Sequence, residues 1–424
     1  MIKGNHLWAA SVLLIIPVTG LAAPVEYSGF VRTEISDNIR QASREEDSDV
    51  LVSAGAQVTR TGERGRFNYD TRLSMSADHY VDESFADRLT GTGELNTRWR
   101  PDAWWDLGLG DVLTQERLDR SQADNPDNRT RRNVLTASLA RNIAPQSAWP
   151  ARLSLTHVRT DYSDPASRDS ERNRIGFGVS HALNRLMQLS LDATTEQTDF
   201  DTDAENRRHE LNLGLSRALS KGRIQASVGG VRLKSKDAIG ASSTFSGASF
   251  NARISQVPHA RYQWAVSLEH TLDDTSSDRL ALSETDELLT LQDSTAVRVT
   301  RLLATSTANL GQAQTLSGRA GYSREVELDP RDTSERYSLG AGYAWVLNPR
   351  VSLGLDLDVE RNVGLNGLDS TLSTASAWYR RNLSRHWSVM SRLTHRQRDH
   401  ELSTNEWDEN RVVVSLEWSG LGHD

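Results

Sequence analysis

Residues 67–79 read FNYDTRLSMSADH, and apolar and polar side chains alternate along this stretch with a period of two. Leu73 and Met75 fall on one face, and Arg72 and Ser74 fall on the other. A period of two is typical of a β-strand that has one apolar face and one wetted face. The same alternation recurs later in the chain, in residues 262–269, 351–359 and 412–418.

Tight turns rich in Gly, Pro, Asn and Ser join these segments two by two into hairpins. These residue types supply the dihedral angles that short hairpins need. Nine such turns recur about every 40 residues, which is the length of one strand–loop–strand–turn unit. They imply up to 20 strands, and a single-chain bacterial barrel favours an even number. Because residues 273–309 are ambiguous, 18 to 20 strands are predicted. The turns are residues 60–65, 100–103, 144–150, 182–185, 218–222, 257–260, 303–309, 346–350 and 382–385.

Most tryptophans lie beside these tight turns or at the end of the last segment. Indole rings prefer the headgroup layer of a bilayer, so tryptophans gathered at one pole predict an aromatic girdle. A soluble β-sandwich or a β-solenoid is the alternative fold, and neither has a reason to place tryptophans at one end. The predicted girdle consists of Trp99, Trp104, Trp105, Trp149, Trp264, Trp345, Trp378, Trp387 and Trp418.

These patterns predict an all-β protein, a transmembrane antiparallel up-and-down β-barrel in the bacterial outer membrane. Closure into a barrel leaves no unpaired strand edge inside the bilayer. The longer connections are acidic, as in residues 119–127, 199–205 and 273–287, and are expected to face outward from the cell. Residues 23–424 are predicted to form one domain.

The N-terminus reads as a secretory signal, with Lys3 before an apolar stretch at residues 7–18 and small residues before cleavage at Ala22. An uncleaved anchor is the alternative, but about 12 apolar residues fall short of the roughly 20 that span a bilayer. The absence of cysteine fits an exported protein without disulfides. A net charge of −8 argues against a nucleic-acid partner.

Charged residues on the wetted faces are expected to line a hydrated lumen. The alternative is a ladder of salt bridges that stiffens the wall, because barrel interiors are polar whatever they conduct. A slip of one residue would exchange the two faces of a strand. The candidates for the lumen wall are Arg72, Arg98, Arg298, Arg319, Asp356, Asp358 and Arg392.

No motif indicates catalysis, a cofactor or a metal. The histidines are scattered and form no His-Glu-x-x-His pair, and no nucleophile motif is recognisable. Residues 199–205 space their carboxylates loosely like a calcium loop, but the mid-loop glycine is missing. We predict that the protein is not an enzyme.

The first part of the chain resembles the EpsL-like, exosortase-system-associated outer-membrane barrels that accompany exopolysaccharide clusters. The resemblance lies in Thr33-Glu-Ile-Ser-Asp-Asn-Ile39, in Ser48-Asp-Val-Leu-Val52 and in Gly62-Glu-Arg-Gly65 followed by Phe67-Asn-Tyr69. In motif it covers about the first 80 residues. It implies a role in the export or assembly of a surface polysaccharide and names no catalytic residue.

The leading hypothesis is a barrel that serves as the exit pore, or a pore-associated scaffold, for an exopolysaccharide. A general or substrate-specific porin for small solutes is the second hypothesis, and a structural or adhesive barrel with a plugged lumen is the third. The expected partners are outer-membrane lipid and lipopolysaccharide, a polysaccharide or small polar solute, and periplasmic export components.

Overall fold

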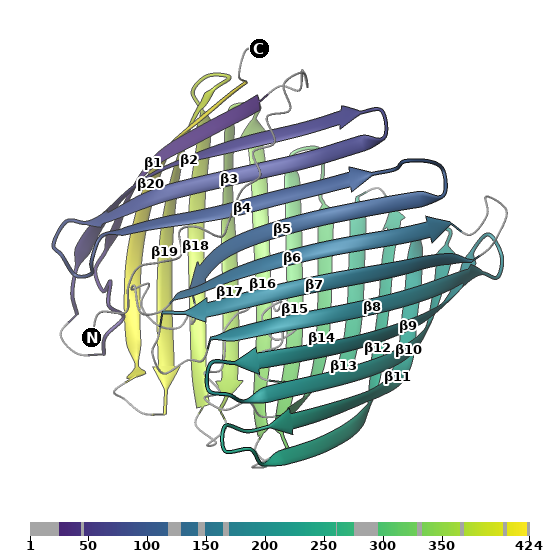
Figure 1. Cartoon of the computed structure of the whole chain (residues 1–424). Coiled ribbons are helices and arrows are strands. Elements are labelled where there is room, and N and C mark those ends of the chain that lie inside the picture. Colours follow the sequence, from purple (N-terminus) through teal and green to yellow (C-terminus); the bar gives the residue numbers. More distant parts are fainter. Residues whose placement is uncertain are drawn as a thin grey trace.

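The computed structural model describes residues 25–43, 46–117, 129–142, 149–163, 169–259, 261–274, 296–328, 333–364, 369–401 and 405–421. The predicted signal sequence, residues 1–22, lies outside these ranges. Within them the chain forms 20 strands joined into one sheet (Figure 1). The strands are β1 Val25–Ser36, β2 Asp49–Arg64, β3 Phe67–Tyr80, β4 Arg88–Trp99, β5 Trp105–Arg117, β6 Arg129–Asn142, β7 Pro150–Tyr162, β8 Ser170–Ala182, β9 Met187–Phe200, β10 Glu205–Leu219, β11 Gly222–Lys236, β12 Ser242–His259, β13 Tyr262–Asp274, β14 Ala296–Asn309, β15 Gln314–Glu327, β16 Thr333–Asn348, β17 Val351–Val363, β18 Asp369–Asn382, β19 Trp387–His400 and β20 Trp407–Leu421.

Every strand pairs antiparallel with the next strand in sequence, and the first strand pairs with the last. Ser28 of β1 lies opposite Ser419 of β20, and the register continues to Ser36 opposite Arg411. This pairing brings the purple and yellow ends of the chain together in Figure 1. The sheet therefore closes into an up-and-down barrel of 20 strands, as predicted, and no strand edge is left at the closure. No helix in the described ranges is long and apolar enough to cross a membrane.

Some predicted turns and loops are shorter than expected because the strands run further. Strand β14 continues to Asn309, so residues 303–309 are strand and the turn follows them. Likewise β9 ends at Phe200 and β10 begins at Glu205, so that the predicted long acidic loop is a tight connection closed by the Phe200 N–H to Ala204 carbonyl bond. Asp199 and Glu205 belong to the ends of the two strands, while Asp201 and Asp203 stay in the turn.

The inner face of the wall can be identified from contacts between strands that are not neighbours. Arg172 of β8 forms an ion pair with Asp274 of β13, which is five strands away in the wall. Such strands can meet only across the interior, so the face of Arg172 is the lumen face. The opposite face carries exposed aliphatic side chains such as Leu357, which is 58% exposed. The barrel therefore has a polar interior and an apolar outer surface, the arrangement of a membrane barrel.

Among the described residues, the buried apolar side chains lie near the ends of the strands that lead to the long connections, which we call the loop end. One small apolar cluster there contains Val231 and Leu233 of β11, Leu272 of β13 and Ala296 of β14. A second contains Ile39, Leu51 and Tyr80, beside Phe85. We call the opposite end, where the short turns lie, the turn end.

The first cluster forms because the end of β13 leaves the wall. Strands β12 and β13 pair from Phe250 opposite His270 towards the turn end, but residues 242–249 of β12 pair only with β11. Beyond His270, β13 still pairs with β14. Leu272 packs so closely on the inner side of β12 that a Cβ atom at Gly247 would lie 3.7 Å from its Cβ. The end of β13 thus leans into the lumen.

Candidate functional site in the barrel lumen

The turn-end half of the lumen holds a cavity of about 1010 Å³ bounded by β9 to β16. Its wall consists of the inward-facing residues of successive strands. Because every second residue faces inward, their hydroxyl and amide groups line the cavity. These groups can exchange hydrogen bonds with a passing hydrophilic molecule without holding it strongly. They belong to Gln188, Ser190, Ser216, Gln225, Ser227, Asn251, Ser267, Thr305, Ser323 and Ser338.

Charged side chains interrupt this polar wall, and many of them are paired along it. Arg319 Nη2 lies 2.8 Å from Asp358 Oδ1, and both side chains remain partly open to the lumen. Arg301 and Arg336, which also line the cavity, face Glu325 and Glu360 at 3.7 and 3.3 Å. These pairs cancel much of the local charge, so the wall is polar without a strong field of one sign.

The register places six of the seven candidate lumen residues on the inner face. Arg72 faces Glu94 at 3.8 Å, and Arg98 is bonded to Asp106. Arg319 and Asp358 form the pair described above. Asp356 and Arg392 share the inner face with their cross-strand partners, Gly342 and Trp378.

Arg298 is the exception, and its predicted place was wrong. Its neighbours Val297 and Val299 are buried on the inner side, at 0% and 3% exposure, while Arg298 itself is exposed on the other side. The rule that wet residues face inward fails here because the lumen side of β14 is covered by packed side chains. The inner positions of the strand are therefore apolar.

A second cavity, of about 790 Å³, lies on the opposite stretch of wall, along β1 to β3 and β18 to β20. Phe30 and Arg32 reach it from β1, and Arg392 reaches it from β19. Trp378 stands opposite Arg392 in the register and lies over Gly354, where an added Cβ would be 2.5 Å from the indole ring. Trp378 is therefore on the lumen face, and its assignment to the outer girdle was wrong.

The other predicted girdle residues are placed at the turn end. Trp99, Trp149 and Trp387 expose 50%, 50% and 43% of their surface, and Trp387 lies opposite Trp418 on the outer face. Trp149 stacks on His181 with ring centroids 4.2 Å apart. Trp105, Trp264 and Trp345 share the outer face of their strands, and Trp104 lies in the turn before β5.

The loop-end half of the lumen is organised differently, around a buried ionic cluster on the inner wall of β8 to β10. Glu196 of β9 is held at 2.5 Å by Arg174 and lies 3.7 Å from Arg172. Arg208 of β10 lies 2.7 Å from Glu210. Apart from Arg174, the side chains of this cluster are no more than 4% exposed.

The inward-leaning end of β13 completes this cluster. Arg208 donates hydrogen bonds to the Leu272 carbonyl at 3.0 Å and to Thr271 Oγ1 at 3.1 Å, and lies 3.9 Å from Asp273. Arg172 lies 3.4 Å from Asp274. Buried charges are tolerated only when they are paired and hydrogen-bonded. The arginines of β8 and β10 therefore hold the end of β13 against the wall.

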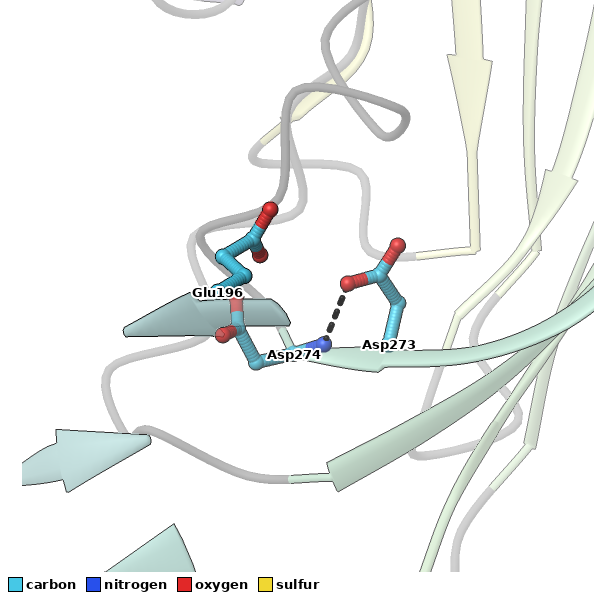
Figure 2. A group of neighbouring side chains, drawn as sticks. All are labelled: Glu196, Asp273 and Asp274. Carbon is cyan, nitrogen blue, oxygen red and sulfur yellow. Dashed lines mark hydrogen bonds between the residues drawn. The ribbon is translucent and has the colours of Figure 1, made fainter. Parts of the chain in front are cut away.

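Three carboxylates of the cluster, those of Glu196, Asp273 and Asp274, gather where β13 reaches the wall (Figure 2). One oxygen from each lies within 4.8 Å of the others, a spacing that a metal ion could bridge. However, the guanidinium groups of Arg172 and Arg208 already face these carboxylates. The Asp273 carboxylate also accepts the backbone N–H of Asp274, the dashed line in Figure 2. Arginine thus provides the positive charge that a cation would otherwise supply.

A second buried polar cluster lies at the loop end, where the barrel closes. Glu409 of β20 is 0% exposed and accepts hydrogen bonds from Ser36 at 2.6 Å and from Gln41 at 3.0 Å. Arg411 Nη2 lies 2.7 Å from it and Arg396 lies 3.6 Å from it. These bonds tie the segment after β1 to the inner wall, so that packing narrows the loop end from two sides.

A carboxyl group in the connection before β8 has a shifted pKa. Asp169 precedes β8, and its Oδ1 accepts the backbone N–H of Tyr162 at 2.8 Å. Burial raises the pKa of the Asp169 carboxyl, against the lowering effect of this hydrogen bond.

The sequence-based prediction of the lumen did not single out the two buried clusters. The signal that exists is local: charged residues recur at alternate positions in Arg172-Asn-Arg174 and in Arg208-His-Glu210. Nothing local shows that they meet β13, because Arg208 and Asp273 are far apart in the chain and are joined only by the inward lean of β13.

No protein-family model and no curated protein matches this chain. Among solved structures it is similar to the FrpB iron transporter from Neisseria meningitidis, with a TM-score of 0.52 and 8% identity over 93% of this chain and 82% of that one. It is similar to the copper transporter OprC, with a TM-score of 0.51 and 9% identity over 94% and 80% of the two chains. It is also similar to P. aeruginosa FpvA bound to heterologous pyoverdines, with a TM-score of 0.50 and 9% identity over 93% and 72%.

Identities this low show the fold alone. With the closed barrel, its polar lumen and its apolar outer face, that fold identifies the protein as an integral β-barrel of the outer membrane.

Proposed function

We propose that the barrel is the exit pore, or a pore-associated scaffold, for an exopolysaccharide. The observation that carries this proposal is the hydroxyl- and amide-lined wall of the 1010 Å³ cavity. A sugar chain presents hydroxyl groups in every direction, and side chains such as Ser227 and Asn251 can replace its water molecules one for one. Each contact is weak, so a chain can slide along the wall.

The charges of the wall suit the same cargo. Pairs such as Arg319 with Asp358 leave little net field to trap a polymer. Arg223 and Arg253 also line the cavity, and in the described part of the chain neither forms an ion pair. Their guanidinium groups are available for the carboxylates of acidic sugars.

Two further features support this proposal. The motifs in residues 33–39, 48–52 and 62–69 resemble barrels that accompany exopolysaccharide clusters. A barrel of 16 to 18 strands already leaves an aqueous channel, so 20 strands provide sufficient width. The end of β13 leans into the loop end of the lumen, so a polymer that leaves there passes beside it.

The test is a deletion strain in which secreted polymer is quantified in the medium and restored by plasmid-borne variants. We expect deletion to abolish or strongly reduce secretion, and wild type to restore it. Ser227→Trp places a bulky side chain in the cavity and should restore secretion poorly. Val228→Trp, at the adjacent position on the outer face, should restore it fully, because Val228 is 60% exposed on the apolar side.

A strain that lacks the protein and still secretes normal polymer would eliminate this proposal. Ion conductance in planar bilayers, combined with a growth defect on a small solute that Ser227→Trp reproduces, would establish the porin alternative instead. A barrel that neither conducts nor affects secretion would be the structural or adhesive type with a plugged lumen.

A further inference from the structure

The outer face of β10 and β11 carries a concentration of positive charge at the loop end. Arg207 and His209 project from β10, and Arg232, Lys234 and Lys236 project from β11; all five are exposed. We call these five residues the basic patch. The strand register sets Arg207 opposite Lys234 and His209 opposite Arg232. Arg207 and Lys234 carry like charges, and such a pair directly opposite in an antiparallel ladder destabilises the sheet.

The patch is poorly neutralised by the protein itself. Glu205 forms an ion pair with Arg207, and His209 Nδ1 lies 2.9 Å from Thr195 Oγ1. Arg232, Lys234 and Lys236 form no ion pair or hydrogen bond within the described part of the chain. Three positive charges at alternate positions of β11 are therefore available to an external partner, although Glu205 lies opposite Lys236 in the register.

Three arginines elsewhere on the outer face of the loop end are neutralised, whereas Arg298 of β14 forms no ion pair within the described part of the chain. Arg159 lies 3.0 Å from Asp161, and Arg324 lies 3.6 Å from Glu335. Arg361 is bonded to Asp369. Unpaired cations are therefore not a general property of the loop end, and β11 carries three of them at alternate positions.

The patch borders the apolar surface that faces the membrane. Leu211 and Leu213 of β10 and Val228 of β11, which follow it towards the turn end, are 54%, 49% and 60% exposed. An amphiphile that packed its acyl chains on these residues would hold its head group at the level of His209 and Arg232. Arginine and lysine both bind phosphate groups, arginine with two parallel hydrogen bonds.

We propose that the basic patch binds the phosphate groups of lipid A, with the acyl chains of that lipopolysaccharide anchor lying on Leu211, Leu213 and Val228. The site is on the outside of the barrel and does not depend on which cargo passes through the lumen. It assigns to β10 and β11 a fixed position for one lipopolysaccharide molecule of the outer leaflet.

The experiment uses the whole chain, purified in detergent and mixed with nanodiscs that contain bisphosphorylated lipid A. The quantity measured is lipid A retained per barrel as lipid concentration is varied. The triple variant R232A/K234A/K236A should weaken retention by about a hundredfold, since each of the three basic residues contributes roughly a factor of five near an anionic surface. Correct folding of each variant is established by its heat-modifiable migration on gels.

The matched control is R159A/R324A/R361A, which removes the same three positive charges from the same end and the same face of the barrel. It should retain lipid A within about twofold of wild type, because those arginines already have carboxylate partners. Equal retention by the patch variant and wild type would overturn the proposal. So would an equal loss in the control, or equal retention of dephosphorylated lipid A or of phosphatidylglycerol.

Discussion

Two ion pairs in the same lumen differ in their surroundings. Arg208 and Glu210, at the loop end, are 2.7 Å apart and only 3% and 4% exposed. Arg319 and Asp358, in the turn-end cavity, are 2.8 Å apart but 35% and 40% exposed. The two distances are alike, and the pairs differ instead in their exposure to water. The loop end is built like a protein interior, and the turn end like a wetted surface.

This difference has an energetic consequence. A buried charge that loses its partner has no solvent to replace it, whereas an exposed charge is rehydrated. Substitutions in the loop end should therefore alter stability and the position of β13. Substitutions in the turn end should mainly alter what passes. The following changes test this contrast, in order of expected effect.

The largest effect is expected for Arg208→Met. It leaves Glu210 and Asp273 without their shared counter-charge and removes the hydrogen bonds to Thr271 and Leu272. We expect a loss of about 3 to 5 kcal/mol in the free energy of unfolding, measured by urea denaturation in lipid vesicles. A loss below about 1 kcal/mol would show that the cluster is hydrated and that the contrast is wrong.

The next effect tests whether the end of β13 lies on β12. In Gly247→Cys/Leu272→Cys the two Cβ atoms would be 3.7 Å apart, within the range of a disulfide. Because the natural chain has no cysteine, this is the one disulfide that oxidation can form within a chain. We expect it to form in intact outer membranes and to stabilise the barrel by up to about 2 to 4 kcal/mol.

Loss of thiol labelling after oxidation measures this bond, with Gly247→Cys alone as the control that stays labelled. Thiols of the double variant that remained reactive would place the end of β13 away from the wall. Conductance before and after reduction then shows whether release of β13 widens the lumen.

A smaller effect is expected at the lumen face of β17 and β18. Gly354→Ala puts a Cβ 2.5 Å from the Trp378 ring and 2.6 Å from the Tyr343 carbonyl oxygen. Such overpacking costs about 1 to 3 kcal/mol. Adding Trp378→Ala should recover part of that loss in the same urea measurement, because the carbonyl contact remains. If the second substitution recovers nothing, Trp378 does not lie on this glycine.

The smallest effect is expected for Arg319→Met. Asp358 is left without its partner but stays in contact with water. The free energy of unfolding should change by less than about 1 kcal/mol in the same assay. Single-channel recordings should nevertheless reveal a shift of ion selectivity towards cations. A stability loss as large as that of Arg208→Met would remove the distinction between the two halves.

Local sequence was sufficient to predict the class of fold. In residues 67–79 and 351–359 one face is consistently apolar and the other consistently polar, so the direction of each side chain follows from a period of two. Tight turns between such segments predicted a closed sheet of 18 to 20 strands, and the structure has 20.

The predictions failed where the contrast between faces is weak or reversed. Strand β18 carries mostly serine, threonine and alanine before Trp378, so its sequence does not show which face is wet. In β14 the inner face carries Val297 and Val299, because the lumen side of that strand is covered. In this strand the polar residue faces outward and the apolar residues face inward, so the prediction placed Arg298 on the wrong face.

The sequence by itself therefore determined that this chain forms strands with one apolar face, and that such strands must close into a barrel in a membrane. Only the tertiary structure decided which parts of the interior are wet. Ser36 and Glu409 are 373 positions apart, and Arg208 meets Asp273 only because β13 bends inward. The physical reason is that strand alternation is a local property, whereas burial depends on which distant segments closure brings together.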